Sequence, residues 1–552
     1  MQVSKVEKIV IGISALILWA VLAAYAGAPI FSDEFLYIDA GLRRFAEPSY
    51  GNRYFHVYLQ KLFVDIAPSP LFGVRIFWGF LISLTAAQVY YHARTFSPHS
   101  NLLQGLLALA FFFSFPFIVE YSGEPAVDIT AMAMVMVFIS VYFYAVRHTE
   151  KRQLALAVLG ALTFMLFKTK ETTVFIFFLL LGFGFTREGR WNWKSLFEIL
   201  QPLLMGLAGS ILLFVILDGL ILGKPFFSIS PSTFNAVLKN YDFQPGFFFE
   251  PSSWYHDYFL DDLLLPFMLF ILGAVRLAPS QPPQSRLLWL YPLLMAAFVT
   301  LNMLKITYGF IERFYFPALP VIAMLAPQVI DIEWPQNRRQ WIWFSLLLAA
   351  AFALMLALRS AMLAYAASLQ FEYTHFLDSI YYPLLLSLLL ASLLWVKRFH
   401  WSVAVFPLFC IGAMLFSPLL YTHKYYFRIP KVRERYDQLM APFAEFAGSL
   451  ELHQDDVLLV SAALERELEM LSNDPNEIIG MYNFFFDGRI NEDNVIIGYT
   501  PALLFKFLSS GDISLALLSA EEWHTVAGQS EISRQYFAMP SADGSFYLLS
   551  KR

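Results

Sequence analysis

Long apolar runs, each followed by a short polar connection, dominate the chain up to about residue 421. Since about 17–25 apolar residues cross a bilayer as one helix, each long run predicts a membrane-spanning helix. We expect about thirteen such spans. They lie near 9–29, 71–91, 101–119, 126–146, 154–167, 172–186, 197–222, 263–279, 287–304, 314–330, 341–358, 379–396 and 402–421. The fifth and sixth runs are short and share a polar joint at 168–171, so they are predicted to form a broken pair.

The pattern changes in the remainder of the chain, 422–552, which is charged and has no spanning run. Short apolar runs there predict strands, helical spacing lies between them, and Asp543-Gly544 predicts a closing hairpin. Strands are expected at 456–460, 495–497 and 513–518, helices at 464–471 and 501–508, and the hairpin at 536–549. Strands that alternate with helices indicate a small α/β domain. The predicted division is therefore a membrane domain, 1–421, and a soluble α/β domain, 422–552.

Composition supports a polytopic α-helical membrane protein. Of the 552 residues, 58% are hydrophobic and 15% are charged, against about 45–50% and about 25% in soluble proteins. This composition excludes a disordered chain, a collagen and a disulfide-rich scaffold. The net charge of −5 comes without a basic stripe, which argues against a nucleic-acid partner.

Basic residues set the orientation. If the N-terminus with Lys5 and Lys8 is cytoplasmic, the short inside loops hold about fifteen basic residues in roughly sixty positions, against about eleven in twice that length outside. The first run is then a retained anchor rather than a cleaved signal peptide. The soluble domain lies outside the cytoplasm, as do two long aromatic-rich loops, 30–70 and 223–262. We expect a plasma membrane of bacterial type, with the chemistry on its extracytoplasmic face.

Two adjacent carboxylates, Asp33 and Glu34, follow the first span directly. Helical spacing continues past Tyr37, which predicts an amphipathic surface helix at the water boundary. A carboxylate held there could accept a proton from an attacking hydroxyl. The alternative is that Ser32 or Asp33 caps the helix.

A second acidic pair, Glu124 and Asp128, has the four-residue spacing that places both on one helix face at the start of the fourth span. Acidic residues at the membrane boundary usually face a polar cavity. Helix capping, with Pro125 at the first helical position, is the alternative.

Cations on the same side could hold a phosphate leaving group. Lys168 and Lys170 stand beside Glu171 in the joint of the broken pair, and Lys305 and Arg313 bracket a short external loop. A solvated joint with a Lys–Glu pair, and an interfacial Glu–Arg pair at 312–313, are the alternatives.

Other signals are weaker. His56 in the first external loop is either a hydrogen-bonded loop histidine or a substrate contact, while Asp218 is interpreted as a helix-end charge. The chain has no HExxH motif, no histidine cluster and no P-loop, so ATP-driven transport has no support. No cofactor is evident, no metal-ligand set can be named, and a divalent cation remains an option.

Several of these features together resemble GT-C membrane glycosyltransferases, in the branch of ArnT and the protein O-mannosyltransferases. The Asp-Glu pair after the first span is similar to that family's first loop, and 312–320 resembles its Arg-Tyr…Pro…Pro helix start. The number of spans, the two external loops and the external C-terminal domain also agree with the family's pattern. The Ser-Gly-Glu-Pro sequence of the second acidic loop has no residue-by-residue counterpart.

The resemblance implies transfer of a hexose or pentose from a polyprenyl-phosphate carrier to a glycan, lipid or protein acceptor. It makes Asp33 the expected catalytic carboxylate, with Glu34 beside it. The expected substrate contacts are Tyr37, His56, Glu124, Asp128, Lys168, Lys170, Glu171, Lys305 and Arg313. An inverting displacement is the hypothesis, and retention is an open alternative. A transporter or flippase of lipid-linked sugars, a polysaccharide polymerase or ligase, and a receptor or scaffold are the competing functions.

Overall fold

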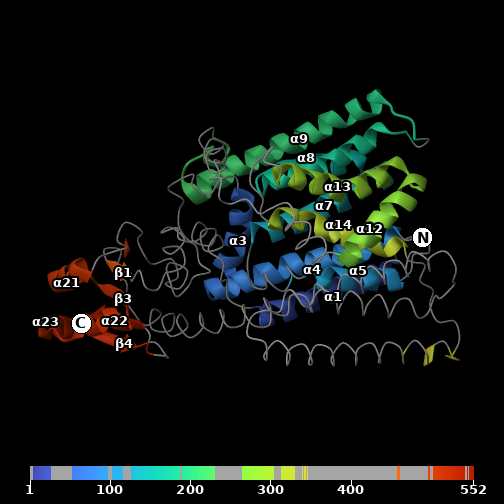
Figure 1. Ribbon diagram of the computed structural model, residues 1–552. Coiled ribbons are helices and arrows are strands. Elements are labelled where there is room, and N and C mark those ends of the chain that lie inside the picture. Colours follow the sequence, from blue (N-terminus) through green and yellow to red (C-terminus); the bar gives the residue numbers. More distant parts are fainter. Residues whose placement is uncertain are drawn as a thin grey trace.

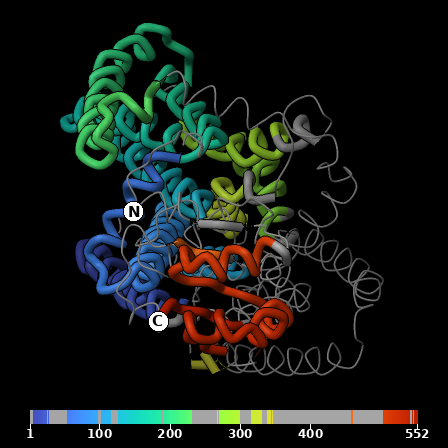
Figure 2. Tube along the Cα trace, turned by 90° about the vertical axis from the view of Figure 1, so that its left-hand side faces the viewer, coloured from blue at the N-terminus to red at the C-terminus, as the bar shows by residue number. Residues whose placement is uncertain are grey.

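A computed structural model describes the chain as a long helical bundle with a small β-sheet beyond one of its ends (Figures 1 and 2). The described residues are 4–26, 53–96, 102–115, 126–186, 189–230, 264–303, 312–329, 457–460, 495–497, 501–540 and 546–552, with isolated positions at 118, 338, 339, 341, 342, 345 and 544.

Ten of the predicted spans coincide with apolar helices of the bundle. Their bounds are α1 Lys5–Tyr25, α4 Pro70–Phe96, α5 Leu102–Ser114, α7 Val127–Arg147, α8 Arg152–Phe167, the 3₁₀ helix η1 Glu171–Gly184, α9 Trp193–Leu217 continued by the π-helical turn η2 Asp218–Leu222, α12 Leu264–Arg276, α13 Pro283–Met303, and α14 Leu319–Leu325 between the 3₁₀ turns η6 Glu312–Ala318 and η7 Ala326–Val329. Within the described part of the chain, 4 helices are long and apolar enough to cross a membrane, and the other apolar helices are shorter. The last three predicted spans lie almost wholly outside the described residues, so the total of thirteen stays a prediction.

The broken pair is present. α8 ends at Phe167, the chain turns through 168–170, and η1 then runs back toward the other end of the bundle. A 3₁₀ helix rises about 2.0 Å per residue, so the 14 residues of η1 extend about 28 Å. That length is close to the roughly 30 Å thickness of a bilayer core, although η1 has few residues for a spanning helix.

Two glycines bring α8 and α9 into backbone contact. A Cβ atom built on Gly160 would lie 1.9 Å from the carbonyl oxygen of Leu203, and one on Gly206 would lie 1.7 Å from that of Ala157. Only glycine allows this approach, which is the usual way for helices to associate where no water is present to drive them together.

The C-terminal residues form a five-stranded mixed sheet. The strands are β1 Leu458–Val460, β2 Val495–Ile497, β3 Leu515–Ser519, β4 Tyr536–Pro540 and β5 Phe546–Lys551, in the order β2-β1-β3-β5-β4. β1 pairs in parallel with β2 and β3, whereas β5 is antiparallel to β3 and β4. Three helices, α21 Pro501–Ser510, α22 Ala520–Ala527 and α23 Ser530–Gln535, accompany the sheet.

The sequence predicted the three parallel strands, α21 and the β4–β5 hairpin at the observed places. It did not predict α22 and α23, which occupy the connection between β3 and β4. Ser519 begins α22 with a reciprocal capping box to Glu522, a four-residue signal that the sequence carries. The proposed helix at 464–471 and the boundary at 421 fall outside the described residues.

One predicted loop is partly helical. The external loop 30–70 contains α3, Tyr54–Ile66, which buries one face against α4. Figure 1 shows α3 at the end of the bundle nearer the sheet.

Candidate functional site

Charged side chains and one histidine, from four separate segments, meet at the α3 end of the bundle. The segments are the start of α3, the first turn of α7, the joint between α8 and η1, and the end of α9 with η2. We call this group the charged cluster. Its members are Arg53, His56, Asp128, Lys168, Lys170, Glu171 and Asp218.

The first ion pair in the charged cluster joins Lys170 to Asp128. Lys170 Nζ donates to Asp128 Oδ1, and both side chains are buried, with 2% and 0% of their areas exposed. Asp128 lies in the first turn of α7, where the N-cap residue Ala126 has no side-chain cap. Asp128 is thus an ion-pair partner, and the simple capping role that the sequence also allowed is wrong.

A second ion pair ties α3 to the joint. Arg53 Nη1 lies 2.6 Å from Glu171 Oε2, and the backbone N–H of Phe55 donates to the carbonyl of Lys168 at 3.1 Å. Lys168 and Lys170 are buried. The alternative of a solvated joint is therefore wrong, since its carboxylate pairs with an arginine 118 positions earlier and not with a neighbouring lysine in solvent.

Lys168 is held in a polar and aromatic environment. Its Nζ donates to the backbone carbonyl of Ser228 and lies 6.0 and 5.8 Å from the ring centres of Tyr54 and Phe164. Burial lowers the pKa of Lys168 to about 8, and the nearby carboxylates of Asp218 and Glu171 oppose that shift. Lys168 is thus a cation at neutral pH that can lose its proton within the working range of an enzyme.

Asp218 is a buried hydrogen-bond acceptor that the sequence analysis missed. Tyr58 donates its hydroxyl to Oδ1 at 2.5 Å, while the N–H and the hydroxyl of Ser228 both donate to Oδ2 at 2.9 Å. Burial and the contact with Asp218 raise the pKa of Tyr58. Asp218 does stand at the end of α9, as the sequence indicated, but it does not reach toward solvent, because its side chain is fully buried.

His56 is a buried helical residue rather than a loop residue. Its Nδ1 lies 2.8 Å from the hydroxyl of Thr130, and its ring contacts Phe77. Burial, with Arg53 nearby, lowers the pKa of His56 to about 3. His56 is therefore uncharged at neutral pH, so any contact it makes with a substrate is a neutral hydrogen bond.

The charges of the described cluster balance. Arg53, Lys168 and Lys170 are the cations, and Asp128, Glu171 and Asp218 are the carboxylates. Burial of six charges is tolerable only because each meets an opposite charge or a set of dipoles. An incoming phosphate would add negative charge to a balanced site, so it must share a cation with a resident carboxylate or bring a further cation with it.

The comparisons with known proteins point to one fold. No family model matches the sequence, and no curated protein is significantly similar to it. Among solved structures, ArnT from Cupriavidus metallidurans bound to undecaprenyl phosphate has a TM-score of 0.57 at 14% identity, covering 98% of this chain and 97% of that one. The same protein in the apo state has a TM-score of 0.56 at 14% identity, with the same coverage. The chain has the GT-C fold.

A further likeness is weaker. The archaeal oligosaccharyltransferase AglB from Archaeoglobus fulgidus, in complex with an inhibitory peptide and a dolichol-phosphate, has a TM-score of 0.41 at 12% identity, covering 97% of this chain and 74% of that one. The likeness to ArnT confirms at the level of fold the GT-C resemblance that the sequence suggested.

Several predicted site residues of this GT-C chain lie outside the described part. They are Asp33, Glu34, Tyr37, Glu124 and Lys305. Arg313 stands second in η6, and its side chain is not among those described. The charged cluster thus brings together five of the predicted residues, His56, Asp128, Lys168, Lys170 and Glu171, and adds Arg53 and Asp218 to them. Tyr58 and Ser228 donate hydrogen bonds to Asp218.

Among the described residues, no group of three or more histidine, cysteine or acidic side chains could hold a metal ion. The option of a divalent cation in this fold stays a prediction.

Proposed function

We propose that this protein is an integral membrane glycosyltransferase that moves a sugar from a polyprenyl-phosphate donor to an acceptor on the extracytoplasmic face. The observation that carries the proposal is the charged cluster, buried at one end of an apolar helical bundle that shares its fold with ArnT over nearly the whole chain. The ArnT structure is bound to undecaprenyl phosphate. A donor of that kind is amphipathic and needs an apolar path next to a charged pocket.

The chemistry requires one base and at least one cation. The acceptor hydroxyl attacks the anomeric carbon, its proton passes to a carboxylate, and the bond from that carbon to the phosphate oxygen breaks with the electron pair on the leaving phosphate. Asp33 is the proposed base, with Glu34 beside it. Lys168, Lys170 and Arg313 are the proposed phosphate contacts, and Lys168 is foremost because Asp128 already neutralises Lys170.

The position of Asp33 in the chain is compatible with this role. α1 packs along α4, with Trp19 Nε1 donating to the carbonyl of Ile76 at 2.7 Å, so the end of α1 lies near the start of α4. Asp33 follows Ala26 by seven positions, a distance of no more than about 25 Å even for an extended chain.

The proposed topology places the cluster outside the cytoplasm. With Lys5 and Lys8 inside, successive passes put 53–66, 126–128, 168–171 and 218–230 on the outer side, and the contacts described above bring these four segments together. The five-stranded sheet lies beyond the same end of the bundle (Figures 1 and 2). Acceptor recognition by this sheet region is part of the proposal.

A donor-cleavage assay tests the function. Purified full-length protein, incubated with polyprenyl-phosphate hexose and pentose donors and native membranes as acceptor source, should release free polyprenyl phosphate, measured by mass spectrometry of the lipid extract. Folded, monodisperse protein that turns over none of these donors would contradict the proposal, and uptake of intact donor into vesicles would favour the transport alternative.

The rate of transfer should fall as the pH rises through about 8, because Lys168 loses the charge that holds the departing phosphate. Above that pH we expect about a tenfold loss per pH unit while Lys168 alone controls the rate. In Lys168→Arg the fall should move to higher pH, since arginine keeps its proton.

The free energy of unfolding should change in the opposite direction, increasing as the pH rises above about 8. The pKa of Lys168 is lower in the folded state than its usual 10.5, so the unfolded chain binds more protons between pH 8 and 10.5. The contribution of Lys168 therefore favours folding increasingly as the pH rises through that window.

A pH profile of activity that is identical in wild type and Lys168→Arg would remove Lys168 from phosphate binding.

A further inference from the structure

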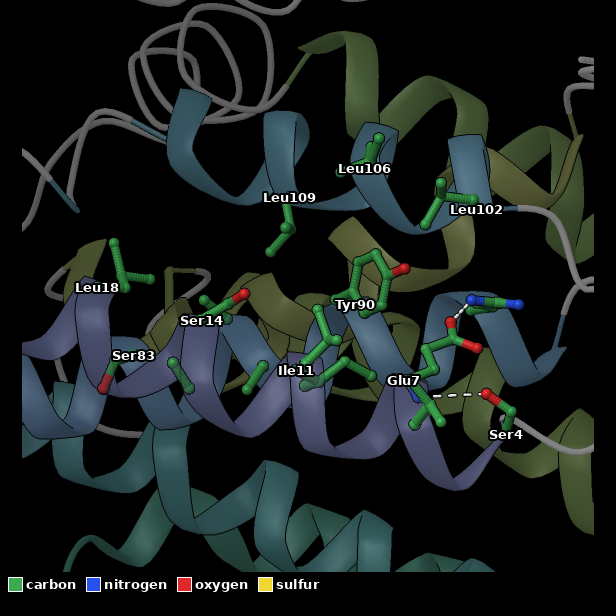
Figure 3. Close-up of a pocket in the computed structure, with 16 residues that line it drawn as sticks. Ser4, Glu7, Ile11, Ser14, Leu18, Ser83, Tyr90, Leu102, Leu106 and Leu109 are labelled. Atoms are coloured by element: carbon green, nitrogen blue, oxygen red, sulfur yellow. Dashed lines mark hydrogen bonds and ion pairs between the residues drawn. The ribbon is translucent and has the colours of Figure 1, made fainter.

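A cavity lies between α1, α4 and α5, away from the charged cluster. It has a volume of about 500 Å³. Figure 3 shows its length along α1, from Ser4 and Glu7 at one end to Leu18 at the other, with Leu102, Leu106 and Leu109 of α5 opposite. We call this cavity the α1 groove.

The walls of the α1 groove are apolar and its floor is made of small residues. Ser83, Ala86 and Ala87 of α4 line it, together with Ser14 and Ala15 of α1. Small side chains leave room that longer ones would fill, so the groove is a feature of the sequence and not of loose packing.

A close contact between α4 and α5 fixes one side of the groove. The ring of Tyr90, which lines the groove, lies against Gly105, where an added Cβ would come within 2.7 Å of that ring. Tyr90 therefore cannot move toward α5 to close the groove.

The groove opens on the face of the bundle that carries the exposed side of α1. Three of the groove's own lining residues are large, apolar and exposed: Val6 at 71%, Val10 at 54% and Leu106 at 40%. Apolar surface of this extent on a membrane helix faces hydrocarbon. An apolar cavity on that surface is in reach of lipid chains and not of water.

Charge gathers at one end of the groove only. Glu7 and Arg94 form an ion pair there, and both line the cavity. Lys5 and Lys8 do not line the cavity, but both are exposed on the turns of α1 next to this end. Three cations against one carboxylate leave a net positive end, as in the basic pockets between membrane helices that bind anionic lipid headgroups.

We propose that the α1 groove binds one acyl chain of an anionic phospholipid, with the phosphate of that lipid at Lys5, Lys8 and Arg94. The lining along α1 from Ser4 to Leu18 extends about 21 Å at 1.5 Å per residue. One leaflet of the hydrocarbon core is about 15 Å deep, so a chain lies in the groove lengthwise with its headgroup at the charged end. In the proposed topology this end faces the cytoplasmic leaflet, and the site is separate from the transfer reaction.

Lipid titration followed by native mass spectrometry tests the proposal. Delipidated full-length protein in neutral detergent is titrated with phosphatidylglycerol and with phosphatidylcholine of the same acyl chains. We expect one tightly bound phosphatidylglycerol, with an affinity about 10- to 30-fold above that for phosphatidylcholine, from two exposed lysines near the headgroup. Ala87→Trp, which fills the groove, should weaken that binding at least about tenfold.

Two variants complete the test. Ile17→Trp adds the same side chain to α1 outside the groove and should leave lipid binding unchanged. Lys5→Gln/Lys8→Gln should reduce the preference for phosphatidylglycerol while the chain still binds, and both lysines are exposed, so the fold is unaffected.

Four outcomes would overturn the proposal. Equal affinity for the two lipids would remove the headgroup site, and undiminished binding in Ala87→Trp would remove the groove. If stoichiometric polyprenyl phosphate displaced phosphatidylglycerol, the groove would be assigned to the donor chain. If the protein formed a dimer that Ala87→Trp abolished, the groove would be assigned to a second copy.

Discussion

Replacing Asp33 by asparagine is expected to lower the rate of sugar transfer by about 10²- to 10⁴-fold, the usual contribution of a general base. The amide cannot accept the acceptor's proton, yet it keeps the size of the carboxyl group and its ability to cap a helix. The measurement is the initial rate of polyprenyl phosphate release by purified variant and wild type under the same conditions.

Glu34→Gln is the matched control for Asp33→Asn, because it removes a neighbouring carboxylate of the same loop. A large loss in Asp33→Asn with a small one in Glu34→Gln assigns the base to Asp33, and the reverse pattern assigns it to Glu34. Near-normal rates in both single variants would rule out either carboxylate as the base. Equal elution on size exclusion and equal Tm exclude a folding defect as the cause.

Lys170→Met should destabilise the protein by about 3–5 kcal/mol, since it leaves the carboxylate of Asp128 buried without its partner. The double variant Lys170→Met/Asp128→Leu removes both charges from the same site. Much of the loss should be recovered there, because an apolar pair of similar volume is often no worse than a buried ion pair. Denaturant unfolding in detergent micelles measures the difference.

An exposed ion pair supplies the control for the Lys170 and Asp128 variants. Lys61 and Asp65 pair at 3.0 Å on the outer face of α3, with side-chain exposures of 24% and 52%. Lys61→Met should change stability by less than about 1 kcal/mol. A Lys170→Met variant no less stable than Lys61→Met would show that the buried pair is not formed.

The double variant also distinguishes a role of Lys170 in stability from a direct contact with the substrate. If Lys170 serves only to neutralise Asp128, restored stability should bring restored transfer. A stable double variant with a slow rate would show that one of the two side chains also contacts the substrate.

Much of the membrane domain could be predicted because hydrocarbon imposes one demand on every span. A backbone without water must satisfy its own hydrogen bonds, so each long apolar run becomes a helix. The ten described spans and the broken pair at 168–170 follow from this rule. The strands of the C-terminal sheet were found by short apolar runs between turn signals.

Which buried polar side chains contact one another could not be predicted in the same way. Arg53 pairs with Glu171 across 118 positions, and Tyr58 contacts Asp218 across 160. No local spacing records such contacts. One signal was available and misread: a carboxylate such as Asp218 at the end of a long apolar run is costly to bury and usually has a specific partner.

The amino-acid sequence by itself determined which segments are helices in the bilayer, where the candidate acids and cations stand along the chain, and which connections share a side. These properties depend on residues near one another, through hydropathy, periodicity and the distribution of lysine and arginine. Only the tertiary structure decided that Lys170 is neutralised by Asp128 while Lys168 faces Ser228, and that a groove runs beside α1. Those outcomes depend on which helices pack together, because a buried charge takes the partner that packing brings within a few ångströms.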